Sequence, residues 1–171
     1  MPTSAPVTLE EYLNTSYHPD CDYVDGRVVE RNLGELDHSD LQGEIVFYFR
    51  ARRKQWRTHA FPGQRVQVAA TRFRIPDICV TIGPKPTEQI FRTPPFLAIE
   101  ILSKKDRKRD VLERIDDYVR FGVNYVWVID PRTREGWVHT AAGAKEAADG
   151  IPRTGNPDLE MSLPEIFAAL A

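Results

Sequence analysis

The chain has 171 residues, 42% of them hydrophobic and 28% charged, which is enough apolar material for one domain with a buried core. Its formal net charge of −2 excludes a field that draws nucleic acid to the whole surface, so any such binding must be local. Cys21 and Cys79 form no CxxC motif, which argues against a disulfide framework or a structural zinc site. We therefore predict a single globular domain over residues 1–171.

The N-terminal residues and the apolar runs predict where the protein resides. Residues Met1–Val7 contain neither a basic segment nor an apolar segment of the signal-peptide type. No apolar run approaches the length of a membrane span. The expectation is a cytoplasmic protein with no membrane partner.

Two local motifs open the chain. Thr8-Leu9-Glu10-Glu11 has the form of a capping box, so a short helix should begin here, with Tyr12 and Leu13 as its apolar contacts. Asp25-Gly26 separates two short runs of strand character, and this dipeptide supplies the positive φ angles that a tight hairpin turn needs. An N-terminal helix followed by a hairpin is therefore predicted.

From His38 onward, the spacing of apolar residues predicts two long helices. Apolar residues recur at three- and four-residue steps from His38 to Trp56, which predicts one long helix that Asp37 or Ser39 could cap. A second amphipathic helix is predicted over 109–121, with Val111, Leu112, Ile115, Tyr118 and Val119 facing inward and Gly122 ending it. The other expected elements are strands at 64–68, 77–82, 96–102, 125–129 and 137–139, a mobile loop at 141–150, and a last helix after Ser162.

This order predicts an α/β (α+β) domain with a mixed central sheet. The strand that contains Glu100, the helix over 109–121 and the strand over 125–129 should form a strand-helix-strand crossover. The apolar region 126–137 could belong to the core of this sheet or to an interface between copies of the chain.

Asp77 and Glu100 are the residues around which we expect the fold to be arranged. Each interrupts a short apolar run of strand character, and a charge in a buried strand is costly unless it is paired. Alternation puts Leu97, Ile99 and Ile101 on one face and Glu100 on the other. If the two strands pair, the carboxylates lie side by side and need a shared cation, such as a divalent metal. The alternative is that the acids lie at strand ends in water.

These residues belong to a longer ordered set that resembles the Uma-two family of restriction-type endonucleases. The set comprises Ile75-Pro76-Asp77, Ala98-Ile99-Glu100-Ile101-Leu102-Ser103, Asp110, Tyr118 and 122–131, preceded by 22–30 and His38. The likeness covers about Thr8 to Val138. It implies membership of the PD-(D/E)XK nuclease superfamily, with a restriction-endonuclease-like core of four mixed strands flanked by helices.

The resemblance also implies roles for individual residues. Asp77 and Glu100 would hold a magnesium ion, for which Mn²⁺ can substitute, that activates water for attack on DNA. Glu30 would be a third acid at the metal, and Glu44 is a weaker candidate for that role. A homodimer is plausible, because cutting both strands needs two sites.

The sequence departs from the superfamily pattern at the motif lysine. Leu102 stands two residues after Glu100, where a lysine is expected, and the matching position on the following helix is Arg114. Arginine stabilises phosphate charge but stays protonated, so it cannot act as a general base. Lys104 or Lys105 could supply the catalytic cation instead. A degenerate nuclease fold that binds nucleic acid or a protein without hydrolysis is the alternative function.

Other polar residues have ordinary structural explanations beside the functional ones. Arg114 could form a surface ion pair with Asp110 or Asp117 on its own helix. His38 could be a helix-start residue that hydrogen-bonds to the backbone. The basic runs at 50–57 and 104–109 could be solvated faces or local binding surfaces.

Overall fold

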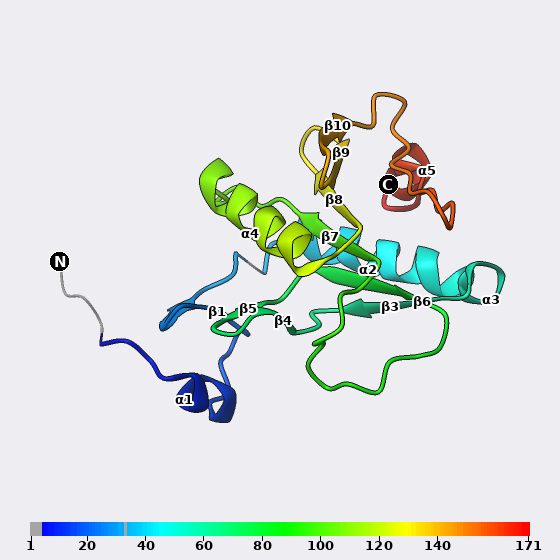
Figure 1. The fold of residues 1–171 in the computed structure, drawn as a ribbon. Helices are drawn as coiled ribbons and strands as arrows, with labels where there is room; N and C mark the ends of the chain where they lie inside the picture. Colours follow the sequence, from blue (N-terminus) through cyan, green and yellow to red (C-terminus); the bar gives the residue numbers. More distant parts are fainter. Residues whose placement is uncertain (1–4, 33) are drawn as a thin grey trace.

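A computed structural model describes residues 5–32 and 34–171 (Figure 1). Within these residues, the helices are α1 (Leu9–Asn14), α2 (Leu36–Ala51), α3 (Arg53–Trp56), α4 (Lys108–Phe121) and α5 (Leu163–Ala169). The strands are β1 (Asp22–Val24), β2 (Arg27–Val29), β3 (Thr58–Pro62), β4 (Val66–Ala69), β5 (Arg72–Arg74), β6 (Ile78–Ile82), β7 (Leu97–Ile101), β8 (Tyr125–Asp130), β9 (Glu135–Thr140) and β10 (Gly143–Glu146). They form two sheets, and the predicted α+β class is confirmed.

The larger sheet is mixed and has the strand order β10-β9-β8-β7-β6-β3. Its central pair, β7 and β8, is parallel, whereas the other pairs are antiparallel. Helix α4 connects β7 to β8, which confirms the predicted crossover. Gly122 ends α4 with a φ of 111°, a left-handed conformation that favours glycine.

The two faces of this sheet are covered by different helices. Leu97, Ile99 and Ile101 of β7 pack with residues of α2 and α5 in one core cluster. Ala98 of β7 packs instead with α4, through a cluster that contains Val111. The predicted alternation of β7 is therefore confirmed, and Glu100 belongs to the face that α4 covers.

The smaller sheet has the order β2-β1-β5-β4 and packs its aromatic residues against α1. Tyr12 of α1 stacks on Tyr23 of β1, with their ring centroids 4.8 Å apart. The capping box is present, because Thr8 accepts a hydrogen bond from the backbone N–H of Glu11. The hairpin between β1 and β2 turns at Asp25 and Gly26, both with positive φ.

Three details of the predicted helices are wrong. The helix expected from His38 to Trp56 is divided at Arg52, whose N–H bonds to the carbonyl of Phe49, three residues back, in a tighter turn. Neither Asp37 nor Ser39 caps α2, because the helix begins earlier and its N-cap is Glu35. On the other helices, two leucines expected to face inward are instead exposed, namely Leu13 and Leu112.

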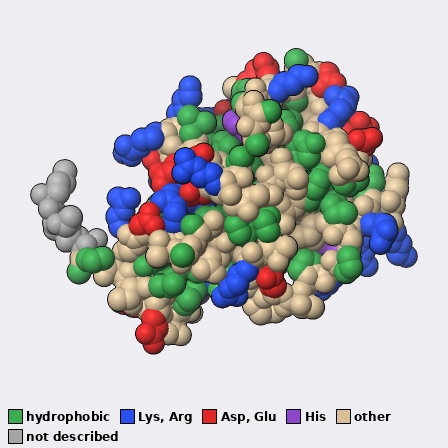
Figure 2. Space-filling model, in the orientation of Figure 1, with side chains coloured by type: hydrophobic (Ala, Val, Ile, Leu, Met, Phe, Trp, Pro, Cys, Tyr) green, Lys and Arg blue, Asp and Glu red, His purple; other side chains and the backbone are tan. Residues whose placement is uncertain are grey.

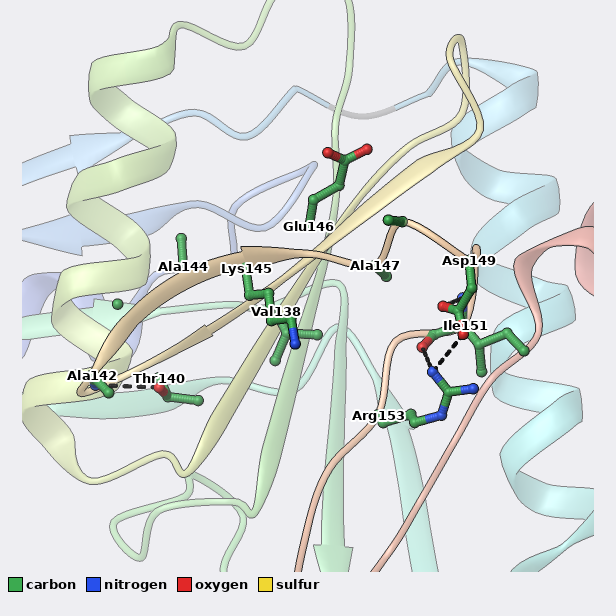
Figure 3. Close-up of a pocket in the computed structure, with 12 residues that line it drawn as sticks. Val138, Thr140, Ala142, Ala144, Lys145, Glu146, Ala147, Asp149, Ile151 and Arg153 are labelled. Atoms are coloured by element: carbon green, nitrogen blue, oxygen red, sulfur yellow. Dashed lines mark hydrogen bonds and ion pairs between the residues drawn. The ribbon is translucent and has the colours of Figure 1, made fainter.

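Three strands were not predicted. Residues 58–62 form β3, and 72–74 form β5, which lies between β1 and β4 in the smaller sheet. Within 141–150, expected to be a mobile loop, residues 143–146 form the exposed edge strand β10. Beside β10 lies an open hollow of about 610 Å³, which Val138 and Ile151 line together with an ion pair between Asp149 and Arg153 (Figure 3).

The apolar strand β8 belongs to the interior. Residues 126–129 are buried by other parts of the same chain, so this segment is core and is not exposed for an interface between copies. Trp127 is fully buried there. None of the helices in the described residues is long and apolar enough to span a membrane.

Candidate active site

The pairing of β6 with β7 places Asp77 and Glu100 at the same point of the sheet. The strand register pairs Ile78 with Ile99, so one further step along both strands puts Asp77 opposite Glu100. The Oδ2 atom of Asp77 accepts a hydrogen bond of 2.8 Å from the backbone N–H of Ile101. Both acids are nearly inaccessible, at 3% exposure for Asp77 and 4% for Glu100. They therefore do not lie at strand ends in water.

Both carboxylates border a cavity of about 30 Å³. This volume can hold an ion or a water molecule but not a nucleotide. The lining residues come from β1, from β2 and the segment after it, from α2, from the adjoining ends of β6 and β7, and from α4 and the loop before it. They are Asp22, Val29, Glu30, Arg31, Asn32, His38, Asp77, Glu100, Ile101, Asp106 and Arg114.

Asp77 is held by residues that lie far from it in the sequence. Arg31 Nη2 donates a hydrogen bond of 2.8 Å to its Oδ1 atom, and His38 Nε2 lies 3.2 Å from the same oxygen. Gln42 Nε2 fixes the backbone by donating to the carbonyl oxygen of Asp77, at 2.8 Å. Although burial alone would lower the pKa of His38, its contact with Asp77 raises that pKa above the ordinary value. The structural explanation of His38 as a residue bonded to backbone is not what the geometry shows.

Glu100 is held mainly by α4. Its Oε1 atom accepts a hydrogen bond of 2.5 Å from the hydroxyl of Tyr118, and its Oε2 atom lies 3.5 Å from Arg114 Nε. Burial, with a smaller contribution from the charge of Asp77, raises the pKa of Glu100 from 4.5 to about 7, against the opposing effects of Arg114 and Tyr118. A carboxyl group with this pKa changes its charge near neutral pH.

Arg114 points toward the acids and not along the surface of its own helix. It contacts Glu100 and also Asp106, at 3.3 Å, and its side chain is 18% exposed. The alternative that it pairs with Asp110 or Asp117 is wrong, since Asp117 contacts Arg72 and Arg74 instead.

Comparison with known proteins identifies the family. The Uma2 family, described as "Putative restriction endonuclease", matches residues 9–171. The chain belongs to this family.

A solved structure agrees with this assignment. It is the crystal structure of a putative nuclease belonging to DUF820 from Anabaena variabilis ATCC 29413, 25% identical to this chain, with a TM-score of 0.83. The match covers 97% of this chain and 100% of that one. No curated protein matches the chain. Family and neighbour together support a nuclease.

Of the other candidate residues, Glu30 lines the cavity and Lys104, Lys105 and Glu44 do not. Glu30 lines the same cavity from the segment after β2, but its side chain is exposed. Lys104 is exposed and is not part of the cavity lining, and the same holds for Lys105. Glu44 lies on α2, one turn and a half beyond His38, and it too is outside the lining.

Sequence reasoning missed Arg31, Asp106 and Asp22. Arg31 follows the predicted hairpin directly, and a cation next to the expected Glu30 was the available signal. Asp22 is buried, accepts the backbone N–H of Ile75, and pairs with Arg74 at 3.2 Å. Burial raises the pKa of Asp22, and Arg74 opposes this. These contacts join β1 to β5 within the smaller sheet and to Ile75, which leads into Asp77.

The donor set fits a divalent cation supported by two protein carboxylates. Oxygen atoms are the preferred ligands of Mg²⁺, which commonly uses one or two carboxylates and keeps several waters. Glu100 Oε2 is the atom best placed for this role, since no hydrogen bond to it occurs among the described residues. In residues 5–32 and 34–171, no three His, Cys, Asp or Glu side chains converge as a complete ion site, so Glu30 is not placed as a third ligand.

Charge balance at the cavity is maintained by arginines. Arg31 neutralises Asp77, and Arg114 lies between Glu100 and Asp106. Figure 2 shows acidic and basic side chains intermingled beside α4, which is the region of these contacts and of the Arg72 and Arg74 pairs. A region of this kind can bind a cation at its acids and an anionic phosphate at its arginines.

Proposed function

We propose that this Uma2 protein is a divalent-metal-dependent endonuclease that hydrolyses phosphodiester bonds of DNA. The observation that carries the proposal is the position of Asp77 and Glu100, which face each other across paired strands and border one small cavity. Mg²⁺, or Mn²⁺ in its place, would be held by these two carboxylates and would supply charge stabilisation and an activated water. The fold and this pair of acids support placement in the PD-(D/E)XK superfamily.

Other residues at the cavity would orient the two acids and bind the phosphate. Arg31 and His38 keep the carboxylate of Asp77 oriented, and Tyr118 does the same for Glu100. Arg114 borders the cavity and can stabilise the negative charge of the scissile phosphate. Because Arg114 keeps its proton, it would bind the phosphate and would not remove a proton from water. The phosphate would approach at the mouth, since the cavity is too small for a nucleotide.

A cleavage assay tests this function. Purified protein is expected to cut plasmid DNA with Mg²⁺ or Mn²⁺ and not with EDTA. Asp77→Asn and Glu100→Gln keep the size of each side chain and should reduce cutting by about a hundredfold or more, because each removes a charged ligand. The matched control is Glu146→Gln, on exposed β10, which should cut as the wild type does. Cutting by Asp77→Asn at the wild-type rate would show that the activity belongs to a contaminant.

A non-hydrolytic binding protein is the second candidate. It is favoured by the absence of any lysine from the cavity lining and by the occupation of Asp77 Oδ1 by Arg31. Calorimetric titration with Mg²⁺ separates the two candidates, because an enzyme must bind the ion and a degenerate fold need not. A protein that binds DNA, takes up no Mg²⁺ at millimolar concentration and does not cut would match the second candidate.

We also propose a homodimer, because cutting both strands of a duplex requires two sites. Light scattering with the purified protein measures the assembly. A monomer that nevertheless linearises plasmid in a single binding event would contradict this part of the proposal.

A further inference from the structure

A second cavity, of about 300 Å³, lies at the outer edge of the larger sheet, where α2 and α3 meet β3. Figure 2 shows Lys and Arg side chains gathered at the end of the molecule where Figure 1 places α3. The cavity is lined by Arg50, Arg53, Thr58, His59, Ala60, Phe61 and Lys85. Its volume falls at the lower end of the range for ligand sites.

The lining is basic and contains no acid. Arg50, Arg53 and Lys85 contribute positive charge, and none of the seven lining residues is Asp or Glu. Among the described residues, these three cations take part in no ion pair within 4.0 Å. Arg50 is also fixed in place, because its Nε and Nη2 atoms both donate to the carbonyl oxygen of Ala60, at 3.3 and 3.2 Å. Such a cavity attracts an anion.

Aromatic rings form another wall. His59 and Phe61 stack with their ring centroids 6.3 Å apart and their planes at 23°. His59 and Phe61 of β3 pair with Thr81 and Cys79 of β6, so their side chains lie on the same face of the sheet as Asp77. Positive charge combined with aromatic rings is the usual composition of grooves that follow a nucleic acid strand.

We propose that this cavity binds a backbone phosphate of the nucleic acid substrate, at a point away from the cleaved bond. Arg53 and Lys85 contact the phosphate, and Arg50 supports them from its fixed position. The proposal rests on the proposed nuclease function for the identity of the ligand. It adds a contact that determines affinity and the position of the strand and that takes no part in the chemistry.

The test measures binding in EDTA, so that cleavage does not enter. Fluorescence anisotropy with a labelled 20-nucleotide single strand, and with the matching duplex, gives the Kd at several salt concentrations. The double variant Arg53→Gln/Lys85→Gln is expected to raise the Kd about tenfold at low salt for both probes. It should also reduce the slope of log K against log salt by about 1, since one phosphate contact is lost.

The control removes the same charge elsewhere. Arg120→Gln/Lys145→Gln changes two cations on α4 and β10, outside this cavity, and should leave the salt slope unchanged. Equal loss of binding in both double variants would overturn the proposal, because the effect would then be one of net charge. Circular dichroism confirms that each variant is folded, as expected for exposed positions.

Two further outcomes separate this proposal from the nuclease function. If the wild type does not cut but Arg53→Gln/Lys85→Gln weakens oligonucleotide binding, the nuclease function fails and the phosphate contact stands. If Asp77→Asn abolishes cutting while the double variant binds normally, the cavity proposal fails alone. The last experiment is calorimetric titration with inorganic phosphate. If Arg53→Gln/Lys85→Gln loses phosphate binding but binds the oligonucleotide as the wild type does, the cavity is a site for free anions and the proposal is overturned.

Discussion

Glu100→Gln is expected to stabilise the metal-free protein at pH 8 while it removes activity. Burial and the charge of Asp77 hold the pKa of Glu100 at about 7, compared with 4.5 for the exposed group. The folded protein therefore binds more protons than the unfolded chain between these two values, and its stability falls as the pH rises through that window. At 1.36 kcal/mol per pH unit, the loss amounts to about 3 kcal/mol above pH 7. Glutamine resembles the neutral acid and avoids this loss.

Urea unfolding in EDTA, followed by the fluorescence of buried Trp127, measures the effect. The free energy of unfolding of Glu100→Gln should exceed that of the wild type by about 3 kcal/mol at pH 8, and the two should converge near pH 5. The control Glu146→Gln, on exposed β10, should differ from the wild type by less than about 0.5 kcal/mol at both pH values.

The same unfolding experiment with added Mg²⁺ tests whether this stability effect belongs to the metal site. Saturating Mg²⁺ should stabilise the wild type at pH 8, by about 2.7 kcal/mol at a hundred times the Kd, and should stabilise Glu100→Gln much less. If Glu100→Gln were no more stable than the wild type at pH 8 without metal, the acid would not be held in an unfavourable charge state. The reasoning from burial would then be refuted.

Two other substitutions test the contacts around the acids. Tyr118→Phe removes the hydrogen bond that lowers the pKa of Glu100, so the acidic limb of the cleavage pH profile should move upward by about one pH unit; an unmoved profile would contradict this role. Arg74→Gln should lower the free energy of unfolding by about 3–5 kcal/mol, because it leaves the buried carboxylate of Asp22 unpaired. Arg120→Gln, which breaks only an exposed pair on α4, should cost less than about 1 kcal/mol, and equal losses would count against the buried pair.

Local rules predicted the centre of the fold well. Alternation assigned both faces of β7, since side-chain direction in a strand has a period of two wherever the strand lies. The capping box at Thr8 and the helix stop at Gly122 were equally accessible, because each depends on residues within four positions of one another. The family likeness rested on these same central elements, and the comparisons confirm it.

The edge strands of the larger sheet, β3 and β10, could not be predicted by the same rules. Strand β3 reads Thr58-His59-Ala60-Phe61-Pro62, with no regular alternation and a proline at its end, and it forms only because β6 offers an edge. Strand β10 has small and charged residues that are exposed throughout, so burial gave no signal. In both cases, the pairing partner determines the structure, and single-sequence patterns do not contain the partner.

Arg31, the cation that contacts Asp77, could not be predicted for a related reason. The residues expected to replace the motif lysine, Arg114, Lys104 and Lys105, all follow Glu100 in the sequence. Arg31 lies 46 residues from Asp77 and reaches it only because the hairpin of the smaller sheet leads the chain past the end of β6. The position of Arg31 therefore depends on how the two sheets pack, which no local pattern encodes.

Asp77 is fixed by contacts with β7, with α2 and with the residue that follows β3. The backbone ladder between β6 and β7 ends at Ile78 and Ile99, and the side chain of Asp77 then accepts the next available N–H, that of Ile101. Its carbonyl oxygen is bound by Gln42 of α2 and by the N–H of Gly63 after β3. Both ends of the residue are therefore fixed, and of its carboxylate oxygens Oδ1 contacts Arg31 and His38 whereas Oδ2 accepts only the N–H of Ile101 among the described residues. A carboxylate held this rigidly is prepared for an ion, because little reorganisation is left to oppose binding.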